Sequence, residues 1–261
     1  MFEILFWFSL GLVIYSYALF PIVLIGLSAL KQIKRDLFFI LRKKERRKQV
    51  NLPHELPKVG IIISAYNEGE CIEARIRILQ SLDYPKDKIK FYIGSDGSQD
   101  NTVDVLQNID DPNLCFIKFE DYRGKASVLN DLVMASSEDY LVFSDANTEF
   151  ETDAIQKLMR HFDAEAPVDA VCGELDLNAE ATGENLDSAY WKYERVLKFN
   201  ESRISGLLGA NGAIYAIRKN CYKPINAENS KNASKNINEG WGLIGHTEWL
   251  LAAAFAKFTR K

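Results

Sequence analysis

The feature that most constrains this chain is an uncharged, strongly apolar segment near its start. Residues Ile4 to Leu30 run for 27 positions without a charged side chain. As a helix, this segment would extend ~40 Å, which exceeds the ~30 Å hydrocarbon core of a bilayer. A cleaved signal peptide would place basic residues before a shorter apolar stretch, whereas here Met1, Phe2 and Glu3 come first. The segment therefore predicts a single transmembrane helix over residues 4–30.

A basic segment follows the apolar one. Between Lys31 and Lys48 the chain carries nine Lys or Arg against Asp36 and Glu45, a net charge of +7. Positive charge beside a membrane span favours the cytoplasmic side and attracts anionic lipid of the bilayer. We therefore expect residues 31–56 to form a juxtamembrane segment and linker at the plasma membrane, with the N-terminus outside and the rest of the chain in the cytosol.

Charge and cysteine spacing exclude two classes of protein. Outside the basic segment the net charge is −11, whereas nucleic-acid binding depends mainly on positive side chains that neutralise phosphates. We expect no nucleic-acid partner. The four cysteines stand at least 44 residues apart, without the spacing of a zinc site. We expect them to be buried, reduced thiols rather than a disulfide framework.

The body of the chain alternates short apolar runs with helical periodicity. The runs begin 25 to 30 residues apart and have helix candidates between them. This alternation is typical of βαβ units, so it predicts an α/β fold with a mostly parallel sheet and helices on both faces. The expected strands are Val59–Ile63, Ile89–Ile93, Leu114–Phe119 and Tyr140–Phe143, and the expected helices begin near Ile72, Thr102 and Lys125.

Polar clusters follow the first, second and fourth expected strands. Ligands of parallel sheets bind beyond the carboxyl ends of the strands, so we expect the three clusters to meet in one site. Polar turns are common after any strand, and it is the joint placement that indicates a function. The clusters are SAYNE at 64–68, SDGSQD at 95–100 and SDAN at 144–147.

Several other site classes fail on spacing. The segment from Asp96 resembles a calcium loop, but Asn101 stands at the sixth position, where glycine is required, and Gln107 replaces the glutamate at the twelfth. The glycines of GLLGANG at 206–212 lack the dinucleotide-binding order and do not follow the first strand. A phosphate loop ending in lysine is absent from the sequence, and its three histidines are widely separated.

Five motifs in a fixed order carry a family resemblance. They are SAYNE, SDGSQDNT, RGKASVLN, FSDANT and GANGAIYAIRK, spread over residues 57–224. Together they resemble the inverting GT-A glycosyltransferases of family 2, a membrane-associated class that includes the synthases of cellulose, chitin and hyaluronan. The resemblance implies a GT-A (Rossmann-like) domain over 57–224, with a nucleotide-binding half at 57–150 and an acceptor-side half at 151–224.

The resemblance also implies an activity and a cofactor. It implies a membrane-anchored enzyme that transfers a sugar from a nucleotide sugar, a UDP-sugar, to a glycan or lipid-linked acceptor with inversion. A divalent cation, Mg²⁺ or Mn²⁺, would bind at the metal motif, whose first acid is Asp145 and whose third position is Asn147. Such a cation neutralises charge on the departing diphosphate.

The family's nucleotide residues map onto individual positions. Ser64 and Tyr66 would line the uracil pocket, and Asp96 would accept a hydrogen bond from the base. The complete set of expected site residues is Ser64, Tyr66, Glu68, Asp96, Arg123, Lys125 and Asp145 for the nucleotide, and Asn211 and Gly212 on the acceptor side.

The chain departs from the family after about residue 225. Family members take the proton of the acceptor hydroxyl with an aspartate in an ED-type motif, and neither that motif nor QxxRW occurs here. Glu248 is a weak candidate for the base. We expect residues 225–261 to be a divergent tail, with truncation favoured over a divergent acid. A non-catalytic nucleotide-sugar binder stays open as an alternative, whereas a sugar nucleotidyltransferase would need a glycine-rich loop that SAYNEGE does not provide.

Overall fold

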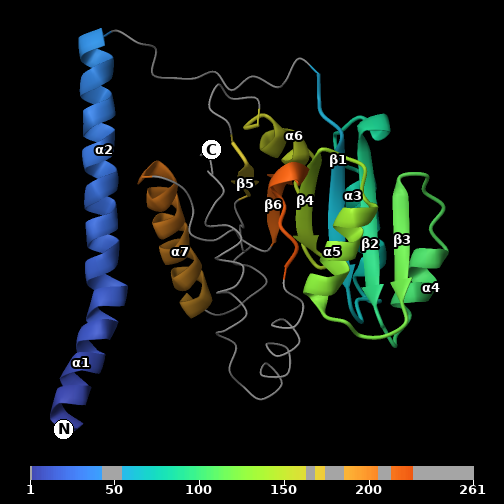
Figure 1. Ribbon diagram of the computed structural model, residues 1–261, viewed down its shortest axis with the longest axis horizontal. Coiled ribbons are helices and arrows are strands. Elements are labelled where there is room, and N and C mark those ends of the chain that lie inside the picture. Colours follow the sequence, from blue (N-terminus) through green and yellow to red (C-terminus); the bar gives the residue numbers. More distant parts are fainter. Residues whose placement is uncertain (1, 43–54, 163–167, 174–184, 205–212, 226–261) are drawn as a thin grey trace. The chain divides into compact units, whose positions relative to one another are not determined.

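The computed structural model describes residues 2–42, 55–162, 168–173, 185–204 and 213–225. These residues fall into two compact units, each treated by itself. The first unit contains the N-terminal helix and one later helix, and the second contains a six-stranded sheet with its covering helices (Figure 1).

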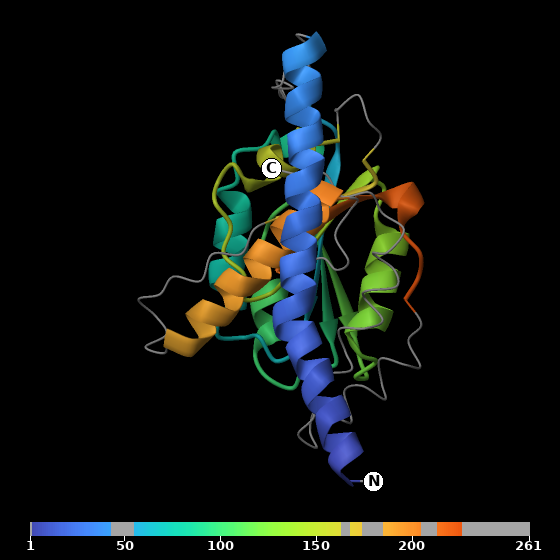
Figure 2. The same ribbon diagram turned by 90° about the vertical axis from the view of Figure 1, so that its left-hand side faces the viewer.

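The N-terminal helix of the first unit is one uninterrupted rod (Figure 2). It consists of α1 (Phe2–Ile14), a π turn (Tyr15–Leu19) and α2 (Phe20–Arg42), and it is long and apolar enough to cross a membrane over Phe2–Leu41. The π turn comes just before Pro21, which lacks an N–H and would crowd the carbonyl of an ordinary helical turn. The single apolar helix expected from the sequence is thus present, and it continues into the basic segment.

Helix α7 (Asn185–Ile204) packs against α2 within the first unit. The Arg203 guanidinium donates to the Gln32 side-chain oxygen over 2.8 Å, and the Lys31 ammonium donates to the Ile204 carbonyl. Helix α7 therefore belongs to the unit of the N-terminal helix, although its residues lie within the segment expected to form the acceptor-side half. The expected domain boundaries stay a prediction.

The second unit contains a mixed sheet of order β3-β2-β1-β4-β6-β5 (Figure 1). The four strands expected from the sequence are parallel to one another, which confirms the mostly parallel sheet. Two further strands, which were not predicted from the sequence, extend the sheet: β6 pairs with β4 and β5 pairs with β6, each in the antiparallel sense. The strands are β1 (Val59–Ala65), β2 (Ile89–Asp96), β3 (Leu114–Phe119), β4 (Tyr140–Asp145), β5 (Ala170–Cys172) and β6 (Ile214–Arg218).

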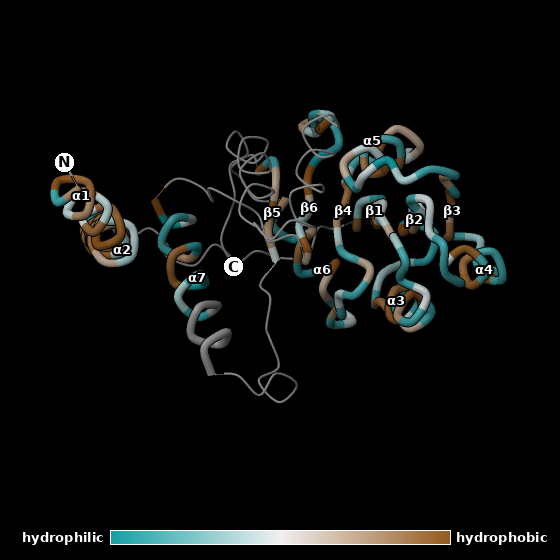
Figure 3. The backbone as a smooth tube through the Cα atoms, turned by 90° about the horizontal axis from the view of Figure 1, so that it is seen from below, coloured by the Kyte–Doolittle hydropathy of each residue, from teal (hydrophilic) through white to brown (hydrophobic). Residues whose placement is uncertain are grey.

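Helices cover both faces of this sheet (Figure 3). Alternation along β1 directs Ile61 and Ile63 into one hydrophobic core and Ile62 into the other, because successive strand residues point to opposite faces. The first core packs under α3 (Ile72–Gln80), α4 (Thr102–Gln107) and α6 (Ala154–Met159), and the second packs under α5 (Lys125–Ala135). Three of these helices begin where the sequence predicted, and α6 was not predicted.

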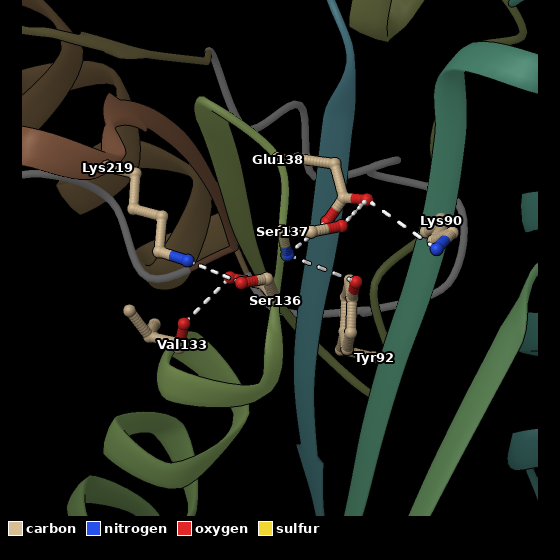
Figure 4. Close-up of polar contacts among 7 residues, drawn as sticks. All are labelled: Lys90, Tyr92, Val133, Ser136, Ser137, Glu138 and Lys219. Carbon is tan, nitrogen blue, oxygen red and sulfur yellow. Dashed lines mark hydrogen bonds and ion pairs between the residues drawn. The ribbon is translucent and has the colours of Figure 1, made fainter.

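Polar side chains contact one another near the amino ends of β2 and β4 (Figure 4). The Glu138 carboxylate, 4% exposed, accepts from the Ser137 backbone N–H (3.1 Å) and hydroxyl (2.9 Å) and lies 4.0 Å from the Lys90 ammonium. Burial would raise the pKa of Glu138, but hydrogen bonds from Tyr92 and Ser137 outweigh it and lower the pKa below 4.5. A methyl group on Gly60 would come within 3.2 Å of this carboxylate.

None of the four cysteines, which all lie in the part of the chain that the structure describes, forms a disulfide bond. They are partly exposed, so the expectation that they are buried was wrong. Cys71, for example, lies just before α3 and close to solvent.

Candidate active site

The predicted polar clusters meet at the carboxyl edge of the parallel strands. Ser64 of β1 and Asp145 of β4 are register partners, and Ala65 of β1 pairs with Ser95 of β2. The chain leaves β1 toward β2 on one side and returns to β4 on the other, so this edge contains the topological switch point of the sheet. Open α/β sheets bind ligands at such a point.

The loops after β1 and β2 are joined through Asn67. Its backbone N–H donates to the Ser98 hydroxyl over 3.1 Å, and its side-chain oxygen accepts from the Gln99 N–H over 2.8 Å. Asn67 has a φ of 54°, a left-handed conformation that asparagine tolerates better than most residues. This contact fixes the backbone next to Tyr66.

A second contact between the same loops centres on Asp100. Its carboxylate accepts from the Gly69 N–H (2.9 Å) and from the Thr102 N–H (3.0 Å) and hydroxyl (2.5 Å). Burial acts to raise the pKa of Asp100, but these hydrogen bonds outweigh it and lower the pKa below 3.8. The Glu68 N–H donates to the Thr102 hydroxyl over 2.9 Å, while the Glu68 carboxylate accepts from the Cys71 thiol over 3.0 Å.

Asp96 ties the second loop to the third. Its two carboxylate oxygens accept from the backbone N–H groups of Arg123 (2.7 Å) and Gly124 (2.8 Å), and the residue is 1% exposed. The neighbouring Gly97 has a φ of 67°, and a methyl group there would lie 2.6 Å from the Tyr122 nitrogen. The structure thus shows that Asp96 holds the turn that begins α5, a role that was not predicted from the sequence.

The two basic candidates of the RGK segment have different surroundings. The Lys125 ammonium forms an ion pair with an Asp145 carboxylate oxygen. The Arg123 guanidinium instead pairs with Asp131 at 2.6 Å and lies 4.6 Å from the Phe119 ring centroid. Of the two, Lys125 is therefore the one that faces the expected metal motif.

The metal motif presents two oxygen donors at the end of β4. The Asp145 side chain is 36% exposed and holds a lysine ammonium, which shows that a positive charge is accommodated there, and Asn147 is exposed. In the described part of the chain no cluster of three or more His, Cys, Asp or Glu forms a closed cage. Mg²⁺ and similar cations usually bind one or two protein oxygens together with water and substrate phosphates, so this donor set fits such a cation.

An aromatic pair lies above the end of β1. The rings of Tyr66 and Tyr122 have centroids 4.7 Å apart at an interplanar angle of 57°, and both residues are exposed. Exposed aromatic faces at the edge of a binding site suit stacking against a base. Tyr122, which precedes the RGK segment, is a candidate for stacking against a base that was not predicted from the sequence.

A second missed residue is Arg75 of α3, which lies buried beneath the metal motif. The sequence contained a signal for it, because Ile72, Ile76 and Leu79 define the apolar face of α3 and Arg75 falls on that same face. A charged residue on a buried helix face requires a partner.

Three expected site residues lie outside the described residues, namely Glu248, Asn211 and Gly212, as does the expected tail beyond residue 225. The described part of the acceptor-side motif begins at Ala213, whose carbonyl accepts from the Ser144 hydroxyl over 2.8 Å. The start of β6 is therefore joined to the residue that precedes Asp145.

Sequence comparison finds relatives of known family. Residues 60–217 match the family model described as Glycosyl transferase family 2. The chain is 32% identical over 212 residues to poly-beta-1,6-N-acetyl-D-glucosamine synthase of Staphylococcus aureus (strain COL), covering 80% of this chain and 50% of that protein. The protein of the same name from Staphylococcus epidermidis is 23% identical over 212 residues, covering 79% and 51%. The chain thus spans about half the length of the curated relatives it matches.

Solved structures share the fold at low identity. A mannosyltransferase from Pyrobaculum calidifontis in complex with GDP-Man and Mn²⁺ superposes with a TM-score of 0.58 at 21% identity, covering 85% of this chain and 64% of that one. Residues 1–349 of Staphylococcus aureus TarS in complex with UDP give a TM-score of 0.50 at 15% identity, covering 66% and 51%. Both likenesses support the expected GT-A fold.

Proposed function

The chain belongs to glycosyl transferase family 2, and from that premise we propose that it transfers a sugar from a UDP-sugar to a glycan or lipid-linked acceptor with inversion. Its staphylococcal relatives are named as synthases of a polymer of N-acetylglucosamine. UDP-N-acetylglucosamine is therefore the first donor to test.

The observation that carries the proposal is the pairing of Ser64 with Asp145 at the switch point of the sheet. This register brings the loop after β1 beside the loop after β4, so a nucleotide over one strand would have its diphosphate over the next. Tyr66 stands two residues after Ser64, and Asn147 stands two residues after Asp145. Ligand sites of open α/β sheets occupy this position.

Lys125 and Asp145 are the groups proposed for the diphosphate end. Asp145 and Asn147 would hold a Mg²⁺ or Mn²⁺ ion, which when bound neutralises negative charge on the leaving diphosphate. Lys125 already pairs with Asp145. Its flexible ammonium can turn from that carboxylate to a phosphate oxygen, so this charge stays close to the leaving group.

Tyr66 and Tyr122 are the groups proposed for the base. Their exposed rings contact one another at the end of β1, and each ring could stack against a base. Asp96 orders the turn that follows Tyr122 and is the residue proposed to accept a hydrogen bond from the uracil edge. Glu68 and Arg123 complete the proposed nucleotide site.

The proposed reaction is a single displacement. The acceptor hydroxyl oxygen forms a bond to the anomeric carbon while the bond from that carbon to the diphosphate oxygen breaks, and UDP departs. A general base takes the hydroxyl proton. Glu248 is the proposed base, and Asn211 and Gly212 are the proposed acceptor-side residues.

We further propose that α1 and α2 anchor the chain in the plasma membrane with the sheet in the cytosol. The helix has the length and composition of a span, and the basic residues follow its apolar part. The acceptor would then be reached from the cytosolic side of the membrane.

The test uses the full chain in lipid nanodiscs. Calorimetry with UDP, GDP and CMP, each with Mn²⁺ and with EDTA, measures nucleotide affinity, and release of UDP from UDP-N-acetylglucosamine measures turnover. We expect UDP to bind tightest, and only with the cation at full affinity. Tighter binding of GDP than of UDP would contradict the proposed UDP-sugar and indicate a GDP-sugar as the donor. Binding without turnover would support a non-catalytic nucleotide-sugar binder.

Lys125→Met tests the diphosphate end, with Lys157→Met as its matched control. Both lysines are partly exposed and paired with carboxylates, but Lys157 pairs with Glu151 and Asp153 next to α6. We expect UDP to bind roughly tenfold more weakly to Lys125→Met, since a charge-assisted phosphate contact is lost. Uridine affinity should be the same in both variants.

A further inference from the structure

Arg75 is a fully buried arginine directly below the metal motif. It comes from α3 and is 2% exposed. One terminal nitrogen, Nη2, donates to the Ser144 hydroxyl oxygen over 2.9 Å, and the other, Nη1, donates to the Thr148 carbonyl. The Phe150 ring centroid lies 4.0 Å from the guanidinium carbon.

The two acceptors of this guanidinium flank the metal motif in sequence. Ser144 precedes Asp145, and Thr148 follows Asn147. The Thr148 N–H also reaches back to the Asp145 carbonyl, over 3.4 Å. One rigid, planar group therefore holds both ends of the turn that presents the two proposed metal ligands.

The contact to Ser144 extends to the start of β6. A hydroxyl has a single proton, and the Ser144 hydroxyl directs it to the Ala213 carbonyl over 2.8 Å. Because the hydroxyl oxygen accepts from Arg75, that proton is turned away from α3 and toward β6. Arg75 thus joins α3, the end of β4 and the first described residue of the acceptor-side motif.

Packing alone does not explain an arginine at this position. Burying a guanidinium is costly, and an apolar side chain of similar size would usually stabilise a core as well or better. The Nε atom is buried and has no hydrogen-bond partner among the described residues, which adds to that cost. Burial lowers the pKa of Arg75 to about 10, and the charge of Asp145 opposes that shift, so the side chain keeps its charge at neutral pH.

We propose that Arg75 is a positioning residue that sets the geometry of the Asp145–Asn147 turn from below. It touches neither donor nor cation and acts through Ser144 and Thr148. Its effect on the cation rests on the function proposed above, whereas its effect on the turn does not.

The first experiment measures the turn itself, without nucleotide or metal. Hydrogen–deuterium exchange of the full chain is compared between wild type, Arg75→Met and Arg218→Met. Arg218 is the matched control, because it also donates to main-chain carbonyls (Val168 and Phe162) and contacts aromatic rings, but at the amino end of β4. We expect exchange at residues 146–148 to rise about fivefold or more in Arg75→Met and to keep its wild-type rate in Arg218→Met.

The second experiment measures the consequence for the cation. Mn²⁺ is titrated at a fixed UDP concentration, and the half-saturating Mn²⁺ concentration is compared with UDP affinity in EDTA. We expect Arg75→Met to raise that Mn²⁺ concentration about tenfold, in the range typical for groups that orient metal ligands. UDP affinity in EDTA should change much less. Arg75→Lys, which cannot span both acceptors, should fall between wild type and Arg75→Met.

Unchanged exchange at residues 146–148 in a folded Arg75→Met protein would overturn the positioning role, whether or not the protein binds nucleotide. If the wild type does not bind UDP, the proposed function is contradicted. The exchange rates at residues 146–148 would then still test whether Arg75 positions the turn. Should Arg75→Met not fold, Arg75→Lys and Ser144→Ala carry the same comparison, because each removes part of the contact and keeps the buried charge.

Discussion

The two ends of β4 hold carboxylates in opposite situations. Glu138, just before the strand, is buried and surrounded by donors from Ser137, Tyr92 and Lys90. Asp145, the last residue of the strand, is partly exposed and pairs with the exposed ammonium of Lys125. The same strand therefore ends in a satisfied structural carboxylate on one side and in a carboxylate available to a ligand on the other.

This difference separates an edge of the sheet that contributes to stability from the edge that carries the proposed site. A buried, fully hydrogen-bonded carboxylate is costly to disturb, since its donors lose their partner. An exposed ion pair contributes little to stability. Substitutions at the amino end should therefore change the free energy of unfolding, and substitutions at the carboxyl end should change binding and turnover.

The largest effect should come from Asp145→Ala. Without this carboxylate the proposed cation loses its one charged ligand, so we expect turnover of the donor to fall at least about 100-fold. The free energy of unfolding should change by less than about 1 kcal/mol, because the substitution removes an exposed ion pair with Lys125 and a longer-range attraction to the Arg75 guanidinium. Donor-hydrolysis kinetics and urea denaturation measure the two quantities. An Asp145→Ala protein with wild-type turnover would contradict the assignment of the proposed site to the carboxyl end of β4.

The next largest effect should come from Glu138→Gln at the opposite end. The amide cannot accept from both Ser137 donors and keep its own N–H groups paired, so we expect a loss of about 1 to 3 kcal/mol in the free energy of unfolding. UDP affinity should stay at the wild-type value. A variant that loses UDP binding while it retains its stability would contradict the division between the two edges.

The stability of the protein at low pH should also depend on Glu138. The pKa of Glu138 in the folded protein lies below 4.5, so the unfolded chain binds this proton first as the pH falls. The contribution of Glu138 is complete above 4.5 and is lost as the pH falls from there through the lowered pKa. Glu138→Gln should flatten the decline of stability in that pH window, as measured by urea denaturation at several pH values.

A smaller effect is expected for Tyr66→Ala. Loss of one stacking surface should weaken UDP binding about tenfold, since stacking on an aromatic ring is worth ~1–3 kcal/mol per base. Tyr66→Phe retains the ring and should bind UDP like the wild type. Calorimetry with both variants separates stacking from a contact of the hydroxyl, and equal weakening would point to the hydroxyl.

The smallest effect is expected for Glu73→Ala, a reference for the surface. Glu73 pairs with Arg77 on the exposed face of α3. Such pairs typically contribute less than about 0.5 kcal/mol. Neither the unfolding midpoint in urea nor UDP affinity should shift measurably, and a large shift in either would show that the assays respond to any lost carboxylate.

The parallel part of the fold could be predicted because its signals are local. The run at Val59 and the three later runs are apolar on both faces, as strands covered by helices on both sides must be, and α3, α4 and α5 show helical spacing. The two antiparallel strands were harder to see. Strand β5 has three residues, and β6 is formed by the five residues IYAIR soon after Gly212, a pattern that suits several conformations.

The convergence of the strand-end clusters could be predicted, whereas the contacts among their residues could not. Strand-end positions identified Ser64, Tyr66 and Asp145, because the carboxyl ends of parallel strands meet by topology. The sequence did not show that Asp96 holds the Arg123–Gly124 turn, since that contact depends on how β3 delivers the chain to α5. Arg75 was likewise not predicted, because the apolar spacing of Ile72, Ile76 and Leu79 indicates a buried helix face and gives no sign of what a charged residue on that face would bind.

The order of strands in the sheet also bears on how the chain is made. Val59 of β1 pairs with Tyr140 of β4, which is 81 positions later. At a synthesis rate of about 5–20 residues per second, the ribosome needs roughly 4 to 16 seconds to supply that partner. Throughout this interval the backbone N–H and C=O groups along one edge of the central strand lack their partners, and unpaired strand edges of this kind are prone to aggregate until a neighbour or a chaperone covers them.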